Sequence, residues 1–512
     1  MTSEAGRLFY AFRGIPYAKP PLGELRFSDP LPAEPWLDQI LDATREGPTC
    51  IQYNTFLRFI QGVEDCLKLN IYTHDLNVTK TLRAVMVWIH GGSWFMSSGN
   101  GGFTDIYGPR YFLDRDIVLV TINYRLGPLG FLSTEDAEAP GNYGLLDQSM
   151  ALRWVNENIR FFGGNPDLVT IFGESSGGAS VHHHLFAPHS KGLFHRAIAQ
   201  SGSALNPWSI EKSVGTYTRM LAKDLDCQSL NSGELLACLR SKPARALAIF
   251  RKKIEVLRIV PIAFGPRIDR ERKLPFISDD PRKLIEQNRI NSVPLITGLN
   301  ENEGAFVVAL LLANNGSLMQ NFTEDPLKYL RYIAGVQFTE DSDKIVNRII
   351  DRYFVRNVTF KNQLTQLEQM ISDCAFFKGI DDSVHLLTKF SRSSYLLLYV
   401  RSSRSIIAAF TFRFTFNLRF RCWSYGRTLL NVHQRLPSTH ECHGRFQSIQ
   451  DSNRLVDYIR TRRRTPKRPC YRWMDVYERR RNTVPQNRCR TSVNGESVDA
   501  ISRSLGLLER RI

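Results

Sequence analysis

Short apolar runs rich in β-branched residues recur along the first 400 positions of the chain. They span residues 84–90, 117–122, 169–172, 293–297 and 395–400. Runs of this length without apolar–polar alternation predict strands buried on both faces. We therefore expect a sheet with both sides covered.

Segments with helical spacing lie between these runs. In residues 145–162 the apolar positions recur three or four apart, and Gly163-Gly164-Asn165-Pro166 ends the pattern. Strands that alternate with helices predict a mostly parallel sheet flanked by helices, which is an α/β fold. We expect residues 1–400 to form one domain of this class.

The pattern changes after residue 400. Residues 412–420 alternate like a strand, and no period is sustained beyond them. Residues 401–512, which we call the tail, contain 24 Lys and Arg against 8 Asp and Glu, so nearly all of the net charge of +17 lies there. The tail has no recognisable nucleic-acid-binding module. We expect it to be poorly ordered, and we expect no nucleic-acid partner.

Composition and hydropathy exclude other classes of protein. The chain is 43% hydrophobic and 23% charged, as globular proteins are. The longest apolar run, Phe306–Ala313, is far shorter than the roughly 18 residues of a membrane helix. Residues 1–4 lack the basic start and apolar stretch of a secretion signal. We expect no membrane span.

Two glycine-rich motifs that follow predicted strands carry the candidate chemistry. Gly173–Gly177 fits G-x-S-x-G, in which a sharp strand-to-helix turn exposes the hydroxyl of Ser175. His90–Trp94 follows another strand, and its glycines let backbone N–H groups approach a substrate oxygen. Either motif alone is compatible with a structural turn. Together they predict nucleophilic acyl transfer.

Further segments match one known family in order. They are residues 12–21, 64–67, 87–92, 123–126, 144–148, 162–164, 173–178 and 192–198. On these residues the chain resembles the type-B carboxylesterases, the family that includes the cholinesterases, and most of all their insect members. The resemblance covers nearly all of residues 10–400. It implies an α/β-hydrolase fold, hydrolysis of a small carboxylic ester through an acyl-enzyme, and no cofactor.

The resemblance also implies roles for individual residues. Ser175 corresponds to the nucleophile. The triad acid of the family is a Glu followed by Gly, which here is Glu303, and the competing Glu301 lacks that glycine. The order of serine before acid is the one this fold uses. The implied oxyanion donors are the backbone N–H groups of Gly92, Ser93 and Ser176.

The expected catalytic histidine is missing. The family places its base about 110–120 residues after the acid, in Gly-x-x-His or a Gly-His motif followed by acidic residues and Leu. No histidine lies between His385 and His433, and His433, His440 and His443 have no matching context. A serine without its base is a weak nucleophile. We therefore expect little or no activity from the chain as written.

A shifted reading frame accounts for this absence. Codons that encode Cys422–His433 can read Ala-Gly-His-Thr-Asp-Glu-Leu when shifted by one base, which is the family's histidine motif. Our hypothesis is that the sequence leaves its true frame between about residues 401 and 422. The alternative is a genuinely divergent C-terminus.

Only 11 residues precede Phe12, so we also expect the domain to be truncated at its N-terminus.

The cysteines and glycosylation sequons fit a secreted protein. By resemblance, Cys50 pairs with Cys66 and Cys227 with Cys238, which leaves Cys374 as a core thiol; free buried thiols are the alternative for the four paired cysteines. N-x-S/T sequons occur at Asn77, Asn315, Asn321 and Asn357. We expect an extracellular glycoprotein.

Several other residues have structural interpretations. His182-His183-His184 is consecutive on a predicted helix, so its side chains diverge and we expect no metal site. Arg26 and Glu64 resemble a family salt bridge. Trp208 is either an acyl-pocket wall or a core aromatic.

The function has one alternative. A non-catalytic adhesion protein, or an inactive fragment, would share the fold. Adhesion proteins of this kind have lost the nucleophile, which is present here.

Two positions bear on the substrate. The Cys50–Cys66 loop has no Trp, unlike the loop of cholinesterases, and Glu174 differs from the Gln of juvenile-hormone esterases. We expect a general carboxylesterase.

Overall fold

The structure of the chain is a computed structural model. It describes residues 1–35, 40–76, 81–101, 108–313, 316–391, 393, 395–400 and 475–477. Asn77, Asn315 and all of the tail except Asp475–Tyr477 lie outside the described residues. The expectations for those sequons, for the three histidines of the tail and for the order of the tail therefore stay predictions.

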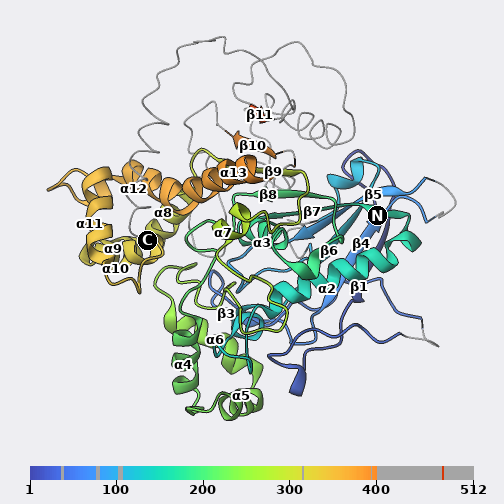
Figure 1. The fold of residues 1–512 in the computed structure, drawn as a ribbon, viewed down its shortest axis with the longest axis horizontal. Coiled ribbons are helices and arrows are strands. Elements are labelled where there is room, and N and C mark those ends of the chain that lie inside the picture. The colour runs from blue at the N-terminus through green and yellow to red at the C-terminus, as the bar shows by residue number, and fades with distance from the viewer. Residues whose placement is uncertain are drawn as a thin grey trace, which may run out of the picture.

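A nine-stranded sheet runs through the molecule (Figure 1). Its order is β1-β4-β6-β5-β7-β8-β9-β10-β11, and the six strands from β6 to β10 are parallel. The strands are β1 (Tyr10–Pro16), β4 (Lys68–Thr73), β5 (Arg83–Ile89), β6 (Ile117–Ile122), β7 (Gly164–Glu174), β8 (Arg196–Gln200), β9 (Leu295–Asn300), β10 (Tyr395–Val400) and β11 (Asp475–Tyr477), with a separate pair of β2 (Gln52–Asn54) and β3 (Phe59–Gln61). The predicted parallel α/β sheet is confirmed.

Helices cover the sheet and extend from it. They are α1 (Gly127–Phe131), α2 (Tyr143–Asn158), α3 (Ser176–His184), α4 (Val214–Asp224), α5 (Ser232–Ser241), α6 (Ala244–Ile254), α7 (Pro281–Glu286), α8 (Ala305–Leu312), α9 (Ser317–Glu324), α10 (Pro326–Ile333), α11 (Ser342–Tyr353), α12 (Leu364–Ile371) and α13 (Lys378–Phe390). A π-helix, Ser372–Phe377, joins α12 to α13. In Figure 1, α8 to α12 form a group to one side of the sheet, and α4 to α6 lie below it.

Both faces of the sheet are buried, as its continuous apolar strands predict. Along β5, Val85, Val87 and Ile89 enter the main core, whereas Met86 and Trp88 pack in a second cluster on the opposite face. This division follows from the two-residue period of a strand. A third cluster is enclosed by α8 to α12, so that helical group has its own core.

Covalent and ionic links tie the segments before α6 together. Disulfides join Cys50 to Cys66 and Cys227 to Cys238, and Cys374 is a buried free thiol. Arg26 forms a two-pronged ion pair with Glu64, with Nε–Oε1 and Nη2–Oε2 distances of 2.7 and 2.6 Å. Loops closed by disulfides of this size typically add about 2–4 kcal/mol to stability.

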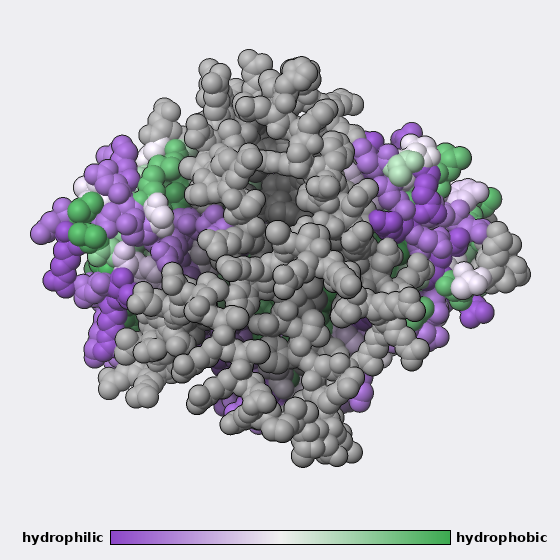
Figure 2. Space-filling view, turned by 90° about the horizontal axis from the view of Figure 1, so that it is seen from above, coloured by the Kyte–Doolittle hydropathy of each residue, from purple (hydrophilic) through white to green (hydrophobic). Residues whose placement is uncertain are grey.

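On one face of the molecule the described residues at its two ends are mostly hydrophilic (Figure 2). Seen from above in Figure 2, the two ends of the molecule are largely purple with separate green patches. Within the part of the chain that the structure describes, no helix has the length and apolar character needed to cross a bilayer.

Candidate active site

The carboxyl ends of five parallel strands meet at one edge of the sheet. Ile89 of β5 pairs with Gly173 of β7, and Glu174 of β7 pairs with Gln200 of β8. Gln200 in turn pairs with Gly298 of β9, and β10 ends level with β9. The segments that follow these strands therefore lie side by side, which is the usual place for a ligand in an open parallel sheet.

Ser175 occupies a strained turn between β7 and α3. Its φ and ψ are 58° and −124°, a conformation that is costly for a residue with a side chain. The turn is held by hydrogen bonds from Ser175 N to the Gln200 carbonyl (2.8 Å) and from Ala179 N to the Ser175 carbonyl (2.9 Å). The strain points to a role for the half-buried Ser175 side chain, since such conformations cluster at functional sites.

The glycines of the G-x-S-x-G motif are needed for close packing. A Cβ on Gly177 would lie 2.2 Å from the Ile89 carbonyl oxygen, and one on Gly173 would lie 2.6 Å from the Gly177 carbonyl. Gly202, which the sequence analysis gave no role, is tighter still, at 2.0 Å from the Ser175 carbonyl oxygen. Three glycines thus let β5, α3 and the end of β8 converge on Ser175.

The His90–Trp94 loop lies against the serine. A Cβ on Gly91 would lie 2.6 Å from the Glu174 carbonyl oxygen and 3.3 Å from the Cβ of Ser175, so the loop packs closely against the turn that carries the serine. Gly92, Ser93 and Trp94 all have positive φ (100°, 55° and 55°), which turns the loop sharply. Among the described residues, the N–H groups of Gly92 and Ser93 donate no backbone hydrogen bond. They are available to an oxygen beside Ser175.

Trp94 anchors this loop. It is fully buried, its Nε1 donates to Ser180 Oγ on α3 at 2.9 Å, and its carbonyl accepts from Gly127 N at 2.8 Å. Its ring lies 5.9 Å from that of Trp208, whose Nε1 donates to the Ala375 carbonyl of the π-helix at 2.7 Å. Trp208 therefore connects the loop to the α8–α12 group, through its ring contact with Trp94 and its hydrogen bond to Ala375.

Glu303 follows β9 and is fixed by donors from two strand ends. Its Oε1 accepts from Ser201 Oγ (2.6 Å), Asn300 N (2.7 Å) and Asn300 Nδ2 (3.2 Å). Burial raises the pKa of Glu303 above its usual value, and these hydrogen bonds offset only part of that rise. Sequence reasoning missed Ser201, because its partner lies 102 positions away.

The glycine after Glu303 is also explained. A Cβ on Gly304 would lie 2.1 Å from the Glu368 carbonyl of α12. Gly304 N donates to Ser372 Oγ (2.8 Å), which itself donates to Glu368 Oε1 (2.8 Å). The Glu303 turn is therefore held from the sheet side and from the α8–α12 group.

Glu174 is a second carboxyl group at the site. Its Oε2 is 3.1 Å from where a Cβ on Gly91 would be. Burial, together with the negative charge of Glu303, raises the pKa of Glu174 to about 8. At neutral pH the Glu174 carboxyl therefore keeps its proton in the folded protein.

This shift predicts how stability depends on pH. An unfolded Glu loses its proton near pH 4.5, so the folded state holds one more proton between about pH 4.5 and 8 and stability falls as the pH rises through that window. We expect Glu174→Gln to remove this loss. The thermal midpoint of the variant relative to wild type should rise by several degrees between pH 5 and pH 9. The exposed Glu286→Gln is the matched control, and a difference for Glu174→Gln that does not change with pH would contradict the assignment.

The three consecutive histidines of α3 are buried in the core and bond separate partners. All are fully buried, and burial lowers the pKa of His182 to about 3, of His183 to about 4 and of His184 to about 3. His182 Nδ1 accepts from Ala204 N at 3.1 Å, and the other two bond different partners. Among the described residues, no group of three potential ligands could hold a metal ion.

No histidine pairs with Glu303 within the described residues, where its hydrogen-bond partners are Ser201 and Asn300. His385 lies on α13, is exposed, and bonds the Asp381 carbonyl at 2.9 Å. The segment that follows β10 lies outside the described residues.

Comparisons with known proteins show what the chain is similar to. The model of the carboxylesterase family matches residues 1–413. Venom carboxylesterase-6 of Apis mellifera is 38% identical over 405 residues, covering 78% of this chain and 72% of that protein. Esterase FE4 of Myzus persicae is 39% identical over 419 residues, covering 79% and 72%. The crystal structure of juvenile hormone esterase from Manduca sexta, with OTFP covalently attached, superposes with a TM-score of 0.68 at 28% identity, covering 78% and 77%.

Proposed function

Because this chain belongs to the carboxylesterase family, whose members hydrolyse carboxylic esters, we propose that Ser175 is its nucleophile. The hydroxyl of Ser175 attacks the carbonyl carbon of a small ester. The alkoxy group of the ester then leaves as an alcohol and an acyl-enzyme remains. Water attacks the acyl-enzyme, releases the acid and restores the serine.

The oxyanion would be held by backbone N–H groups of Gly92, Ser93 and Ser176. The close packing of the Gly91 backbone against the Ser175 turn supports this role, because a carbonyl carbon attacked by Ser175 would then lie beside the loop. Ser176 is the first residue of α3, so its N–H has no partner within the helix and faces the same anion. Each such donor is typically worth about 3 kcal/mol in the transition state.

Glu303 is proposed as the acid that orients the base. The observation that carries this assignment is the Ser201 hydroxyl, which donates to Glu303 while the adjacent Gly202 packs on the Ser175 backbone. These contacts favour Glu303 over Glu301. The base itself would come from the segment after Val400, in the shifted frame that restores Gly-His-Thr-Asp-Glu-Leu. The family match ends at residue 413, which supports a change of frame near that point.

The substrate and location are proposed on narrower grounds. A general carboxylesterase is favoured, because several different esterases match at similar identity. Secretion is supported by two disulfides and by exposed sequons at Asn321 and Asn357. The alternative is a non-catalytic adhesion protein or an inactive fragment; the missing histidine favours it, and the presence of Ser175 and Glu303 argues against it.

Covalent labelling tests the proposal. The protein with the restored frame should be modified by a fluorophosphonate, and mass spectrometry should find the adduct on the peptide that contains Ser175. The chain as printed, which lacks the base, should react far more slowly. An adduct on another serine, or equal labelling of both chains, would contradict the assignment.

A further inference from the structure

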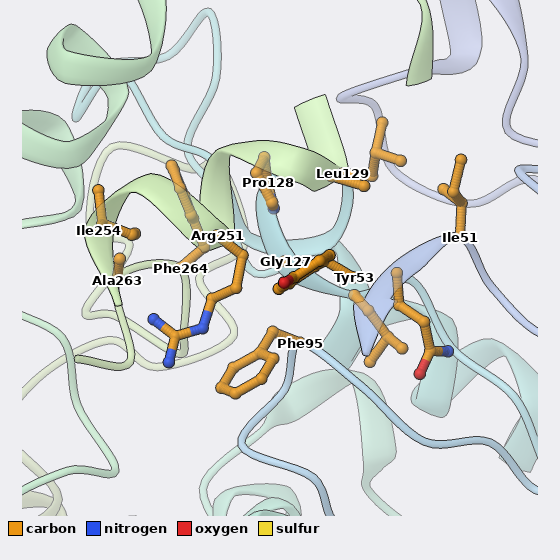
Figure 3. Close-up of a pocket in the computed structure, with 13 residues that line it drawn as sticks. Ile51, Tyr53, Phe95, Gly127, Pro128, Leu129, Arg251, Ile254, Ala263 and Phe264 are labelled. Atoms are coloured by element: carbon orange, nitrogen blue, oxygen red, sulfur yellow. The ribbon is translucent and has the colours of Figure 1, made fainter. Parts of the chain in front are cut away.

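The His90–Trp94 loop and the turn that carries Glu303 are fixed in different ways. Phe95, the residue after the loop, packs against Arg251 of α6, with the guanidinium carbon 4.3 Å from the centre of the ring (Figure 3). The cavity beside them has a free volume of only about 20 Å³, which is room for one water molecule. Packing therefore holds the loop, whereas hydrogen bonds hold the Glu303 turn.

Glu303 has one carboxylate oxygen that is fixed and one that is available. Among the described residues, the hydrogen bonds from Ser201 and Asn300 all end at Oε1 of Glu303. Oε2 is then the oxygen that could accept from a base. The direction of the side chain depends on the backbone of Glu303, and the peptide plane that it shares with Gly304 is rigid. The orientation of this peptide is therefore part of the geometry of the acid.

Ser372 fixes the peptide between Glu303 and Gly304. Gly304 precedes the first turn of α8, so its N–H has no acceptor within that helix. It donates instead to Ser372 Oγ at 2.8 Å, and Ser372 Oγ donates to Glu368 Oε1 at 2.8 Å. Ser372 and Glu368 are only 6% and 8% exposed, so water does not readily replace either bond. The hydroxyl of Ser372 thus links the acid turn to α12.

Ser372 also begins the π-helix, which binds the segment after β8. Asn206 Nδ2 donates to the Ala375 carbonyl of the π-helix at 2.9 Å, and Asn206 Oδ1 accepts from Ser203 N at 2.6 Å. Ser203 lies two residues after Ser201, the hydroxyl donor to the acid. π-helical turns are rare and frequently occur at functional sites. One short element therefore contacts both segments that hold the acid.

We propose that Ser372 is a positioning residue for Glu303, acting through the backbone of Gly304, and that the π-helix fixes the acid relative to Ser175. The inference rests on the proposed function, because it gives Ser372 a part in the same reaction. Loss of the Ser372 hydroxyl would leave the buried Gly304 N–H without its acceptor, and the turn would shift to find another. Glu303 would then orient the base less well, and small displacements of catalytic groups are costly in rate.

A double-mutant cycle in the protein with the restored frame tests the inference. Ser372→Ala should lower kcat for 4-nitrophenyl acetate about 10- to 100-fold and leave KM unchanged within about threefold. In a Glu303→Ala background the same substitution should not lower kcat further, because no acid remains to be positioned. A kcat unchanged by Ser372→Ala, or an equal loss in both backgrounds, would overturn the inference.

Two further variants control for folding. Ser372→Cys keeps the size of the side chain but forms only weak hydrogen bonds, so it should reproduce the loss of kcat even if Ser372→Ala fails to fold. Ser383→Ala removes a similarly buried hydroxyl, which donates to the Ile380 carbonyl on α13 at 2.8 Å. It should leave kcat unchanged. Equal losses of kcat in the variants of Ser372 and Ser383 would overturn the inference.

Hydrogen exchange tests the contact without any need for activity. In the full chain as printed, Ser372→Cys should speed the exchange of the Gly304 amide at least about tenfold, whereas Ser383→Ala should not. Unchanged exchange in Ser372→Cys would overturn the inference and leave the proposed function intact. Faster exchange in a protein whose kcat, in the restored frame, does not depend on Glu303 would instead contradict the proposed acid, and with it the role of Ser372.

Discussion

A protein translated with the frame shifted by one base between codons 401 and 422 is expected to hydrolyse 4-nitrophenyl acetate at least about 10³-fold faster than the chain as printed. The printed chain places Ser175 and Glu303 at one edge of the sheet, but no described histidine pairs with the acid. A serine hydroxyl without a base is a poor nucleophile at neutral pH. The restored histidine would follow β10, the next parallel strand along the sheet.

The measurement combines sequencing of the transcript with a burst assay on both proteins. In the restored protein, Gln in place of the new histidine should return the rate to that of the printed chain, which shows that the histidine and not better folding is responsible. Thermal midpoints of the two proteins control for folding. A burst of 4-nitrophenol from the printed chain at the restored rate would refute the need for this histidine, and an unchanged transcript would refute the frameshift.

In the restored protein, Ser175→Ala is expected to lower kcat by at least about 10³-fold, because no acyl-enzyme can form. Residual hydrolysis would come from the oxyanion donors and substrate binding alone. The thermal midpoint should change little or rise. Alanine keeps the backbone and the Cβ of this strained turn and removes only the hydroxyl group. Loss of activity without loss of stability separates a catalytic role from a structural one.

The matched control for this variant is Ser241→Ala, an exposed serine at the end of α5. It should leave kcat and the thermal midpoint unchanged. Fluorophosphonate labelling should disappear in Ser175→Ala and persist in Ser241→Ala. Activity that survives in Ser175→Ala at more than a tenth of the parent rate would remove Ser175 from the mechanism.

The parallel sheet could be predicted from local pattern. The apolar run at residues 117–122 coincides with β6, and residues 395–400 coincide with β10. The helical pattern of residues 145–162 became α2 followed by a 3-10 turn, which Gly163 ends at a φ of 76°. Such elements follow from side-chain periodicity and from residues that only certain backbone conformations accept.

The packing of the helical group α8 to α12 could not be predicted from local pattern. Phe306–Ala313 was judged only as too short for a membrane, and most of it forms α8 in a separate core. Its apolar side chains are buried by helices that come later in the chain. Local pattern records that a segment is apolar but not which segment covers it.

The nucleophile motif and the oxyanion loop were evident in the sequence because each is a short segment whose glycines serve its own turn. The hydrogen bond from Ser201 to Glu303, the packing of Gly202 on Ser175 and the raised pKa of Glu174 appeared only in the structure. These features depend on distances between residues from different strands and helices. Sequence therefore determined the elements and the chemistry each carries, and the order of strands in the sheet decided which groups meet, because contacts and burial are set by neighbours that are remote along the chain.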